Sequence, residues 1–257
     1  MDTGTASAAR NVRPLRQPPI LSCYFPLGDP MVGLDLLDVF IAEGVDVIEI
    51  GMSAPNPFLD GPDIRSSMAR ADRANWRGDL DRVLEHLAQY ARPPKALLMT
   101  YVDTAHPALS DTGLWRGIDS LLVVARKGDR LALAVEQAAV EKGVALSAFL
   151  SLPLANDEVT RARSAAFYVM LQAAEGQTGP RETLDGESHA RIARLRADGV
   201  DAPILLGFGI SSGRQAREAR DQDADGIIVG SQVLRAALAG RDELKSLLRD
   251  LRSGLDA

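Results

Sequence analysis

Eight short apolar segments recur along the chain, and longer amphipathic stretches separate them. Such segments are typical of strands buried on both faces, as in a parallel sheet that is covered by helices. Strands that alternate with helices predict βαβ units, and eight units in 257 residues favour one closed barrel over an open doubly wound sheet. The predicted fold is an α/β (βα)8 TIM barrel that forms a single domain. The expected strands are residues 20–25, 45–50, 95–101, 118–124, 145–152, 166–171, 203–207 and 226–230.

The stretches between these strands predict helices, with one exception. Only 15 residues separate Tyr101 from Gly117, and they include Pro107 and Gly113, so a short or irregular connection is expected there. Residues 1–18 show no periodicity and are interpreted as a flexible N-terminal leader, which leaves residues 19–257 for the catalytic barrel. Helices are expected at residues 34–43, 63–74, 79–90, 130–142, 156–164, 188–198, 212–222, 232–239 and 241–252.

Composition excludes several classes of protein. A net charge of −6 argues against a general nucleic-acid binder, which needs a basic surface to neutralise phosphates. Cys23 is the single cysteine, and His86, His106 and His189 lack the spacing of metal ligands, so neither a disulfide nor a metal site is expected. No signal peptide and no apolar run of ~20 residues is present, which predicts a cytoplasmic protein without membrane contact.

Glu49 lies near the end of the second predicted strand, between two isoleucines. A barrel carries its active site at the C-terminal ends of the strands, and a carboxylate is costly to bury unless it is paired or used. Burial would raise the pKa of this carboxyl and suit it to proton transfer near neutral pH. A structural glutamate bonded to a neighbouring strand is an equally good interpretation of its position alone.

Asp60 ends a loop, residues 51–62, whose path is restricted by three prolines and two glycines. It is a candidate for a second acid/base group, although Asp60-Gly61-Pro62 is also ordinary turn chemistry. Asp29, after the first strand, is a turn former or a group that orients the site. Arg126, after the fourth strand, belongs to a second anion site or to a solvated loop.

Glycine- and serine-containing turns follow the last two strands, at residues 207–212 and 230–231, and each opens a helix. Helix N-termini present unpaired N–H groups, and the loops after strands 7 and 8 are the usual phosphate site of this barrel. These turns predict a phosphate site, with ordinary serine-capped turns as the alternative. Residues 176–179, after the sixth strand, could add a third backbone donor or a mobile lid.

An ordered set of landmarks, from about Leu21 to Leu234, resembles the tryptophan synthase α-subunit family. They are Leu27-Gly28-Asp29-Pro30, Glu49-Ile50-Gly51, Asp60-Gly61-Pro62, Met99-Thr100-Tyr101, Thr178-Gly179, Gly207-Phe208-Gly209-Ile210-Ser211-Ser212 and Gly230-Ser231.

The resemblance implies a lyase that cleaves indole-3-glycerol phosphate into indole and glyceraldehyde 3-phosphate without a cofactor. Glu49 would match the proton donor to indole C3 and the base at the side-chain hydroxyl, and Asp60 the carboxylate that stabilises charge at the indole N–H. Tyr168 is a candidate for a family tyrosine near the sixth strand. Tyr101, Phe208, Tyr24 and Ile64 would bind the substrate, and Gly179, Gly209, Gly230 and Ser231 its phosphate.

The loops after strands 2, 3, 4 and 6 depart from the family pattern: the segment between strands 3 and 4 is shorter than in the family, and the strand 6 loop, residues 174–179, is longer. Residues 53–57 read Ser-Ala-Pro-Asn-Pro where the family has Pro-x-Ser-Asp-Pro, and residues 126–128 read Arg-Lys-Gly where it has Asp-Leu-Pro or Asp-Val-Pro. The first of these loops communicates with the β subunit, a PLP enzyme, so coupling to that partner is left open. The remaining hypotheses are a coupled or free-standing lyase, a barrel enzyme that acts on another aryl or sugar phosphate, and a non-catalytic partner that regulates a β-like enzyme.

Overall fold

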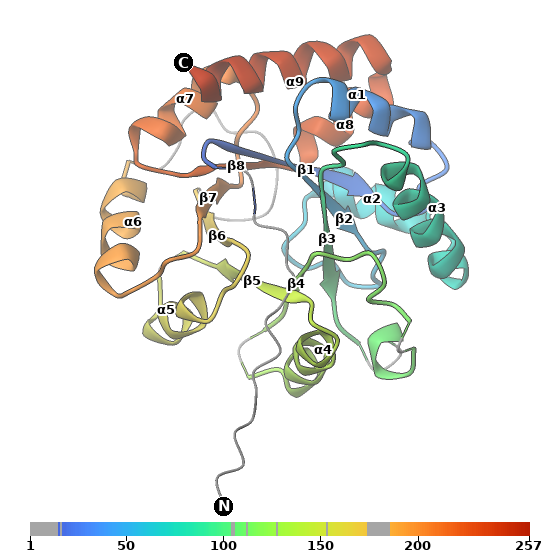
Figure 1. The fold of residues 1–257 in the computed structure, drawn as a ribbon, viewed down its shortest axis with the longest axis horizontal. Coiled ribbons are helices and arrows are strands. Elements are labelled where there is room, and N and C mark those ends of the chain that lie inside the picture. Colours follow the sequence, from blue (N-terminus) through green and yellow to red (C-terminus); the bar gives the residue numbers. More distant parts are fainter. Residues whose placement is uncertain are drawn as a thin grey trace, which may run out of the picture.

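The eight predicted strands form one closed parallel barrel, in which each strand pairs with the next and β1 pairs with β8. The computed structural model describes residues 15, 17–103, 106–111, 113–126, 128–152, 154–173 and 186–257. Figure 1 shows the strands at the centre and the helices around them. The strands are β1 (Ile20–Pro26), β2 (Val47–Gly51), β3 (Lys95–Tyr101), β4 (Ser120–Val124), β5 (Ala145–Leu150), β6 (Val169–Gln172), β7 (Ile204–Gly207) and β8 (Gly226–Val229).

Helices follow the strands in sequence and cover the outside of the barrel (Figure 1). The barrel prediction is therefore confirmed. The leader expected at residues 1–18 and the segment 176–179 fall almost entirely outside the described residues. The α-helices are α1 (Leu37–Ala42), α2 (Pro62–Arg70), α3 (Trp76–Ala88), α4 (Arg130–Glu141), α5 (Asn156–Arg163), α6 (Ser188–Ala197), α7 (Gly213–Asp221), α8 (Ser231–Ala239) and α9 (Arg241–Asp256).

Some predicted boundaries differ from those observed. The helix expected at residues 63–74 ends at Arg70, because Ala71 is extended and the side chain of Asp72 accepts a hydrogen bond from the Ala74 amide. That bond caps a separate 3-10 turn, Arg73–Asn75, which leads directly into α3. Another 3-10 turn, Leu34–Leu36, forms the start of the first predicted helix.

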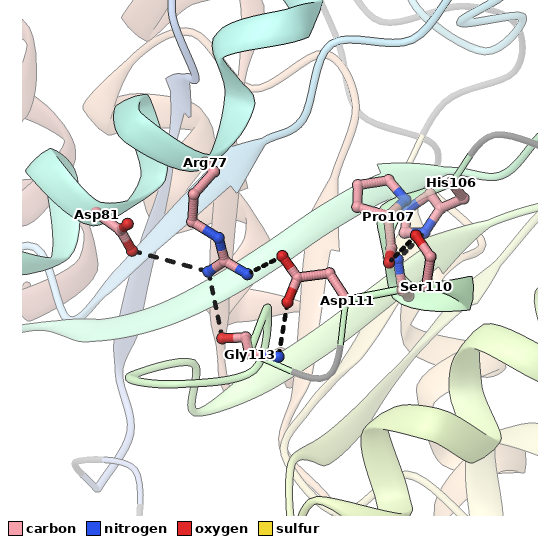
Figure 2. Close-up of polar contacts among 8 residues, drawn as sticks. Arg77, Asp81, His106, Pro107, Ser110, Asp111 and Gly113 are labelled. Carbon is pink, nitrogen blue, oxygen red and sulfur yellow. Dashed lines mark hydrogen bonds and ion pairs between the residues drawn. The ribbon is translucent and has the colours of Figure 1, made fainter.

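The connection between β3 and β4 is short, as predicted, and contains a 3-10 turn, Pro107–Leu109. Arg77 of α3 holds this connection (Figure 2), because its guanidinium donates to Asp111 Oδ2 over 2.6 Å and to the Gly113 carbonyl over 3.2 Å. The side chain of Asp111 also accepts from the Gly113 amide. In this connection, hydrogen bonds from Arg77 and within the loop therefore take the place of the helix that other units of the barrel have.

The C-terminal helix α9 packs against α7, α8 and α1 beside the seam between β8 and β1 (Figure 1). Arg252 of α9 donates to Asp46 Oδ2 and to the Pro19 carbonyl, both over 3.0 Å. These bonds tie the end of the described chain to the residues that precede β1 and β2. No described helix is long and apolar enough to cross a membrane.

Candidate active site

A pocket opens at the C-terminal ends of the strands, where the sequence predicts the site. Nine of the ten predicted site residues line it, and Gly179 lies outside the described residues. Two buried carboxylates, a group of apolar and aromatic side chains and the start of a helix therefore meet in one cavity. The nine residues are Tyr24, Glu49, Asp60, Ile64, Tyr101, Phe208, Gly209, Gly230 and Ser231.

Glu49 projects from β2 into the pocket and is 4% exposed. The Tyr168 hydroxyl donates to its Oε1 over 2.8 Å. Burial raises the pKa of Glu49 to about 7, the tyrosine bond opposes the rise and the nearby charge of Asp60 adds to it. The group can therefore exist as an acid or as a base near neutral pH, which is the property that proton transfer requires.

Asp60 is also 4% exposed, although it belongs to a loop. Its amide donates to the Pro57 carbonyl over 3.1 Å, which closes a turn just before the predicted one at residues 60–62, and its Oδ2 accepts a 2.8 Å hydrogen bond from the Tyr101 hydroxyl. Gly61 is extended and Pro62 begins α2, so residues 60–62 lead into the helix. Burial, and then the charge of Asp60, raise the pKa of Tyr101, so the phenol remains a donor. The turn and the site interpretations of Asp60 are thus compatible.

The loop that carries Asp60 is attached to the end of β3 and to the β4–α4 loop by a stack of side chains. The ring of Phe58 contacts Tyr101 edge-on, with ring centroids 5.3 Å apart. The exposed guanidinium of Arg126 lies 5.1 Å from the Phe58 centroid, in the range of a cation–π contact. Arg126, one of the departures from the family pattern, therefore braces the β2–α2 loop from the β4–α4 loop.

The N-terminus of α8 enters the same pocket. Gly230 precedes the helix, Ser231 is its first residue, and both line the cavity. The Ser231 hydroxyl is buried and has no hydrogen-bond partner among the described residues. Unpaired helix amides and a nearby hydroxyl donor together form an arrangement that can bind an anion.

Aromatic and aliphatic side chains form the walls of the pocket. Phe208 has a left-handed backbone with φ of 71°, and its ring lies against that of Phe149 with centroids 5.7 Å apart. Several other lining residues were not among the predicted site residues. For Leu122 and Val124, strand-end positions two residues apart on β4 were the available signal. The additional lining residues are Leu59, Met99, Leu122, Val124, Phe149, Met170, Ile210, Ile228 and Gln232.

Tyr24 contributes an aromatic ring to the pocket wall, and this ring carries a hydroxyl group. Its ring packs where a Cβ on Gly51 would overlap it, so the glycine permits this approach. The hydroxyl is buried and has no hydrogen-bond partner within the part of the chain that the structure describes. Tyr24 also pairs with Glu49 in the parallel register of β1 and β2.

Asp29 supports the site from outside the pocket. It accepts from Ser67 Oγ over 2.5 Å and from Arg70 Nε over 2.9 Å, both on α2, and from the Met31 amide over 3.1 Å. Burial works against the charged form, but the bonds from Arg70 and Ser67 hold the pKa of Asp29 below its usual value. Asp29 is thus both a turn former and an anchor for α2, the helix that begins beside Asp60.

The described residues contain no cluster of His, Cys, Asp and Glu that could hold a metal ion.

Comparisons with known proteins point to one family. The family model described as tryptophan synthase alpha chain matches residues 17–253. The chain is 32% identical over 225 residues to the tryptophan synthase alpha chain of Synechococcus elongatus, covering 83% of this chain and 82% of that one. It is 28% identical over 233 residues to that of Clostridium beijerinckii, covering 86% of each.

Solved structures show the same architecture. The structure of Mycobacterium tuberculosis tryptophan synthase superposes with a TM-score of 0.79 at 24% identity, covering 93% of each chain. An Aquifex aeolicus structure gives the same TM-score at 22% identity and covers 93% of this chain and 94% of that one. At these identities the structural likeness establishes the barrel, and the family model and the sequence relatives establish the family. The chain belongs to the tryptophan synthase alpha-chain family.

Proposed function

We propose that this chain is a carbon–carbon lyase that cleaves indole-3-glycerol phosphate into indole and glyceraldehyde 3-phosphate. One observation carries the proposal: Glu49 and Asp60 are both buried in a single, largely apolar pocket that also receives the N-terminus of α8. An indole ring needs apolar walls, its N–H needs an acceptor, and a phosphate needs the helix end. Family membership supports the same assignment.

Glu49 performs both proton transfers. With a pKa of about 7, a large fraction of the side chain is protonated at neutral pH and can protonate C3 of the indole ring. The ring then becomes an electron sink and accepts the electron pair of the breaking C–C bond. The carboxylate left behind takes the proton of the side-chain hydroxyl as that oxygen becomes the aldehyde oxygen. One proton enters and one leaves, so Glu49 ends the cycle protonated.

Asp60 stabilises the ring while it carries positive charge. Protonation at C3 places that charge on the indole nitrogen, whose N–H becomes a stronger donor. Asp60 already accepts from Tyr101 through Oδ2, and a carboxylate has capacity for further hydrogen bonds. A preorganised acceptor of this kind lowers the barrier without reorganisation during the reaction.

The phosphate is assigned to Gly230 and Ser231 at the N-terminus of α8, together with Gly209. Gly179 remains a fourth phosphate-binding candidate from the sequence. Tyr24, Ile64, Tyr101 and Phe208 are assigned to the substrate's ring and side chain. We place the activity in the cytoplasm.

The relatives are named alpha chains of tryptophan synthase, and we propose that this chain likewise binds a β subunit. The stack of Arg126, Phe58 and Tyr101 braces the Asp60 loop from within the chain. This internal brace supports measurable lyase activity of the chain by itself, with the β subunit as an activator.

The test is indole release from indole-3-glycerol phosphate by the purified chain, measured alone and with a tryptophan synthase β subunit. Release under both conditions is the expected result, with a faster rate when the β subunit is present. Absence of indole under both conditions would contradict the proposal. Binding of the substrate without cleavage would then indicate a regulatory partner, and absence of binding would indicate another aryl or sugar phosphate.

A further inference from the structure

The hydroxyl of Tyr24 is a buried polar group for which none of the residues that the structure describes supplies a hydrogen-bond partner. The residue is 2% exposed, and its side chain lines the pocket that contains Glu49 and Asp60. An unpaired buried hydroxyl lowers the stability of the folded protein, and native structures contain few of them. In an otherwise apolar pocket wall, a phenylalanine would avoid this loss.

Neither of the two carboxylates serves as the hydrogen-bond partner of the Tyr24 hydroxyl. Glu49 Oε1 accepts from Tyr168 over 2.8 Å, and Asp60 Oδ2 accepts from Tyr101 over 2.8 Å. Each acid is therefore already oriented by a different tyrosine. Ser231 and Gln232, the other polar side chains that line the pocket, do not pair with the Tyr24 hydroxyl in the described structure either. A bound molecule is therefore the partner that would satisfy it.

The strand register places Tyr24 beside the residue that takes the proton from the substrate. Tyr24 and Glu49 are Cα partners on β1 and β2, so their backbones lie about 4.8 Å apart, and both side chains line the pocket. Burial, and then the charges of Asp60 and of Glu49, raise the pKa of Tyr24, so its hydroxyl keeps its proton. This hydroxyl can therefore donate to a substrate oxygen that is bound beside the two carboxylates.

We propose that the Tyr24 hydroxyl is a catalytic hydrogen-bond donor to the substrate oxygen that becomes the aldehyde oxygen. The inference rests on the proposed lyase function and adds a third polar group to it. As the O–H bond breaks, the proton passes to Glu49, the C=O bond forms, and the electron pair of the C–C bond returns to the ring. Tyr24 keeps its own proton and stabilises the negative charge that develops on the oxygen.

The substitution Tyr24→Phe separates this role from that of an apolar wall, because it removes the oxygen and keeps the ring. For a donor, kcat falls about tenfold to a hundredfold, since the donor acts on charge present only in the transition state. The melting temperature stays the same or rises, because an unpaired buried hydroxyl has been removed. A pure wall residue would leave kcat unchanged.

A matched control is Tyr90→Phe. The Tyr90 hydroxyl donates to Asp38 Oδ1 over 2.6 Å, outside the pocket. This variant is expected to lose a little stability and to keep its kcat, which is the reverse of the pattern for Tyr24→Phe. A second control is binding of indole-3-propanol phosphate, measured by calorimetry. This analogue lacks the side-chain hydroxyls, so Tyr24→Phe should bind it within about twofold of the unmodified protein, because no donor contact is lost.

The outcomes are distinguishable. An unchanged kcat in Tyr24→Phe, with an active unmodified protein, overturns the role of the hydroxyl and leaves the lyase function standing. A lowered melting temperature, or weakened binding of the analogue, shows that the hydroxyl is structural and also overturns the inference. An unmodified protein that releases no indole overturns the lyase function, and the inference falls with it.

Discussion

The hydroxyl of Tyr168 lies 2.8 Å from Oε1 of Glu49, and both side chains are buried. Tyr168 precedes β6 and Glu49 lies on β2, so the bond spans the barrel interior. It fixes one carboxyl oxygen and favours the ionised form, while burial favours the neutral form. The balance between these two effects leaves the carboxyl able to serve as acid and as base.

Replacing Glu49 with glutamine tests the assignment of the proton carrier. The amide retains the size of the side chain and can still accept from Tyr168, but it cannot transfer a proton. We expect kcat to fall about a thousandfold or more, with KM changed only slightly. Steady-state indole release measures this, and circular dichroism checks the fold. Activity within tenfold of the unmodified protein would remove Glu49 from the mechanism.

The same substitution makes a prediction about stability and pH. The folded pKa of Glu49, about 7, lies above the ordinary value of 4.5, so the folded state binds this proton more tightly than the unfolded state. The stabilisation that results is fully present below about pH 4.5 and is lost as the pH rises through 7. The difference between the folded and the unfolded pKa of Glu49 corresponds to about 3 kcal/mol of unfolding free energy.

Glutamine stays neutral at every pH and does not lose this stabilisation. The unfolding free energy of Glu49→Gln, relative to the unmodified protein, should therefore rise by about 3 kcal/mol between roughly pH 5 and pH 8. Urea denaturation at several pH values measures the difference. Parallel stability curves for the two proteins would show that Glu49 titrates normally.

Tyr101→Phe removes the donor that orients Asp60 but keeps the ring against Phe58. A hydrogen bond to a charged acceptor is worth about 1.5–3 kcal/mol, so we expect kcat to fall about tenfold or more. The fold should persist because the aromatic contact remains. If kcat is unchanged while stability falls, the bond has a structural role only.

Ser231→Ala tests the phosphate assignment. Its hydroxyl is unpaired among the described residues, so we expect little loss of stability and an increase in KM of about threefold to tenfold, with kcat nearly constant. The comparison variant is Ser211→Ala, because the Ser211 hydroxyl already lies 2.9 Å from Gln215 Oε1. A higher KM in the Ser211 variant alone would place the phosphate at the β7–α7 loop.

Asp29→Asn tests the anchor of α2. The Asp29 side chain is fully buried, whereas the Arg70 side chain is 28% exposed, so solvent weakens the pair. We expect the free energy of unfolding to fall by about 2 kcal/mol. Asp81→Asn is the control: Asp81 lies 3.8 Å from Arg77 on the surface (Figure 2), and its loss should cost less than about 0.5 kcal/mol.

Much of the barrel could be predicted from sequence because its strands are short, apolar and separated by amphipathic helices. All eight predicted strands are present, and β3 has the predicted bounds. Helix ends were less predictable. The break after Arg70 depends on the side chain of Asp72, a local capping bond whose geometry the apolar pattern does not contain.

The site was predictable where strand position and family resemblance agreed, as for Glu49 and Tyr101. The alternation of side chains could have added Leu122 and Val124 on β4, but it does not tell which strands reach the pocket. The bond between Tyr168 and Glu49 joins residues 119 positions apart, and no local pattern encodes such a pairing.

The backbone at Phe208 has a further consequence for the evolution of this pocket. A phenylalanine with φ of 71° is held in a conformation that L residues adopt at a cost of about 1–2 kcal/mol. The aromatic wall is therefore maintained against a local preference for glycine. In a descendant that binds a bulkier ring, replacement of Phe208 by glycine would enlarge the pocket. The same replacement would remove the backbone strain, so pocket size and stability would increase together.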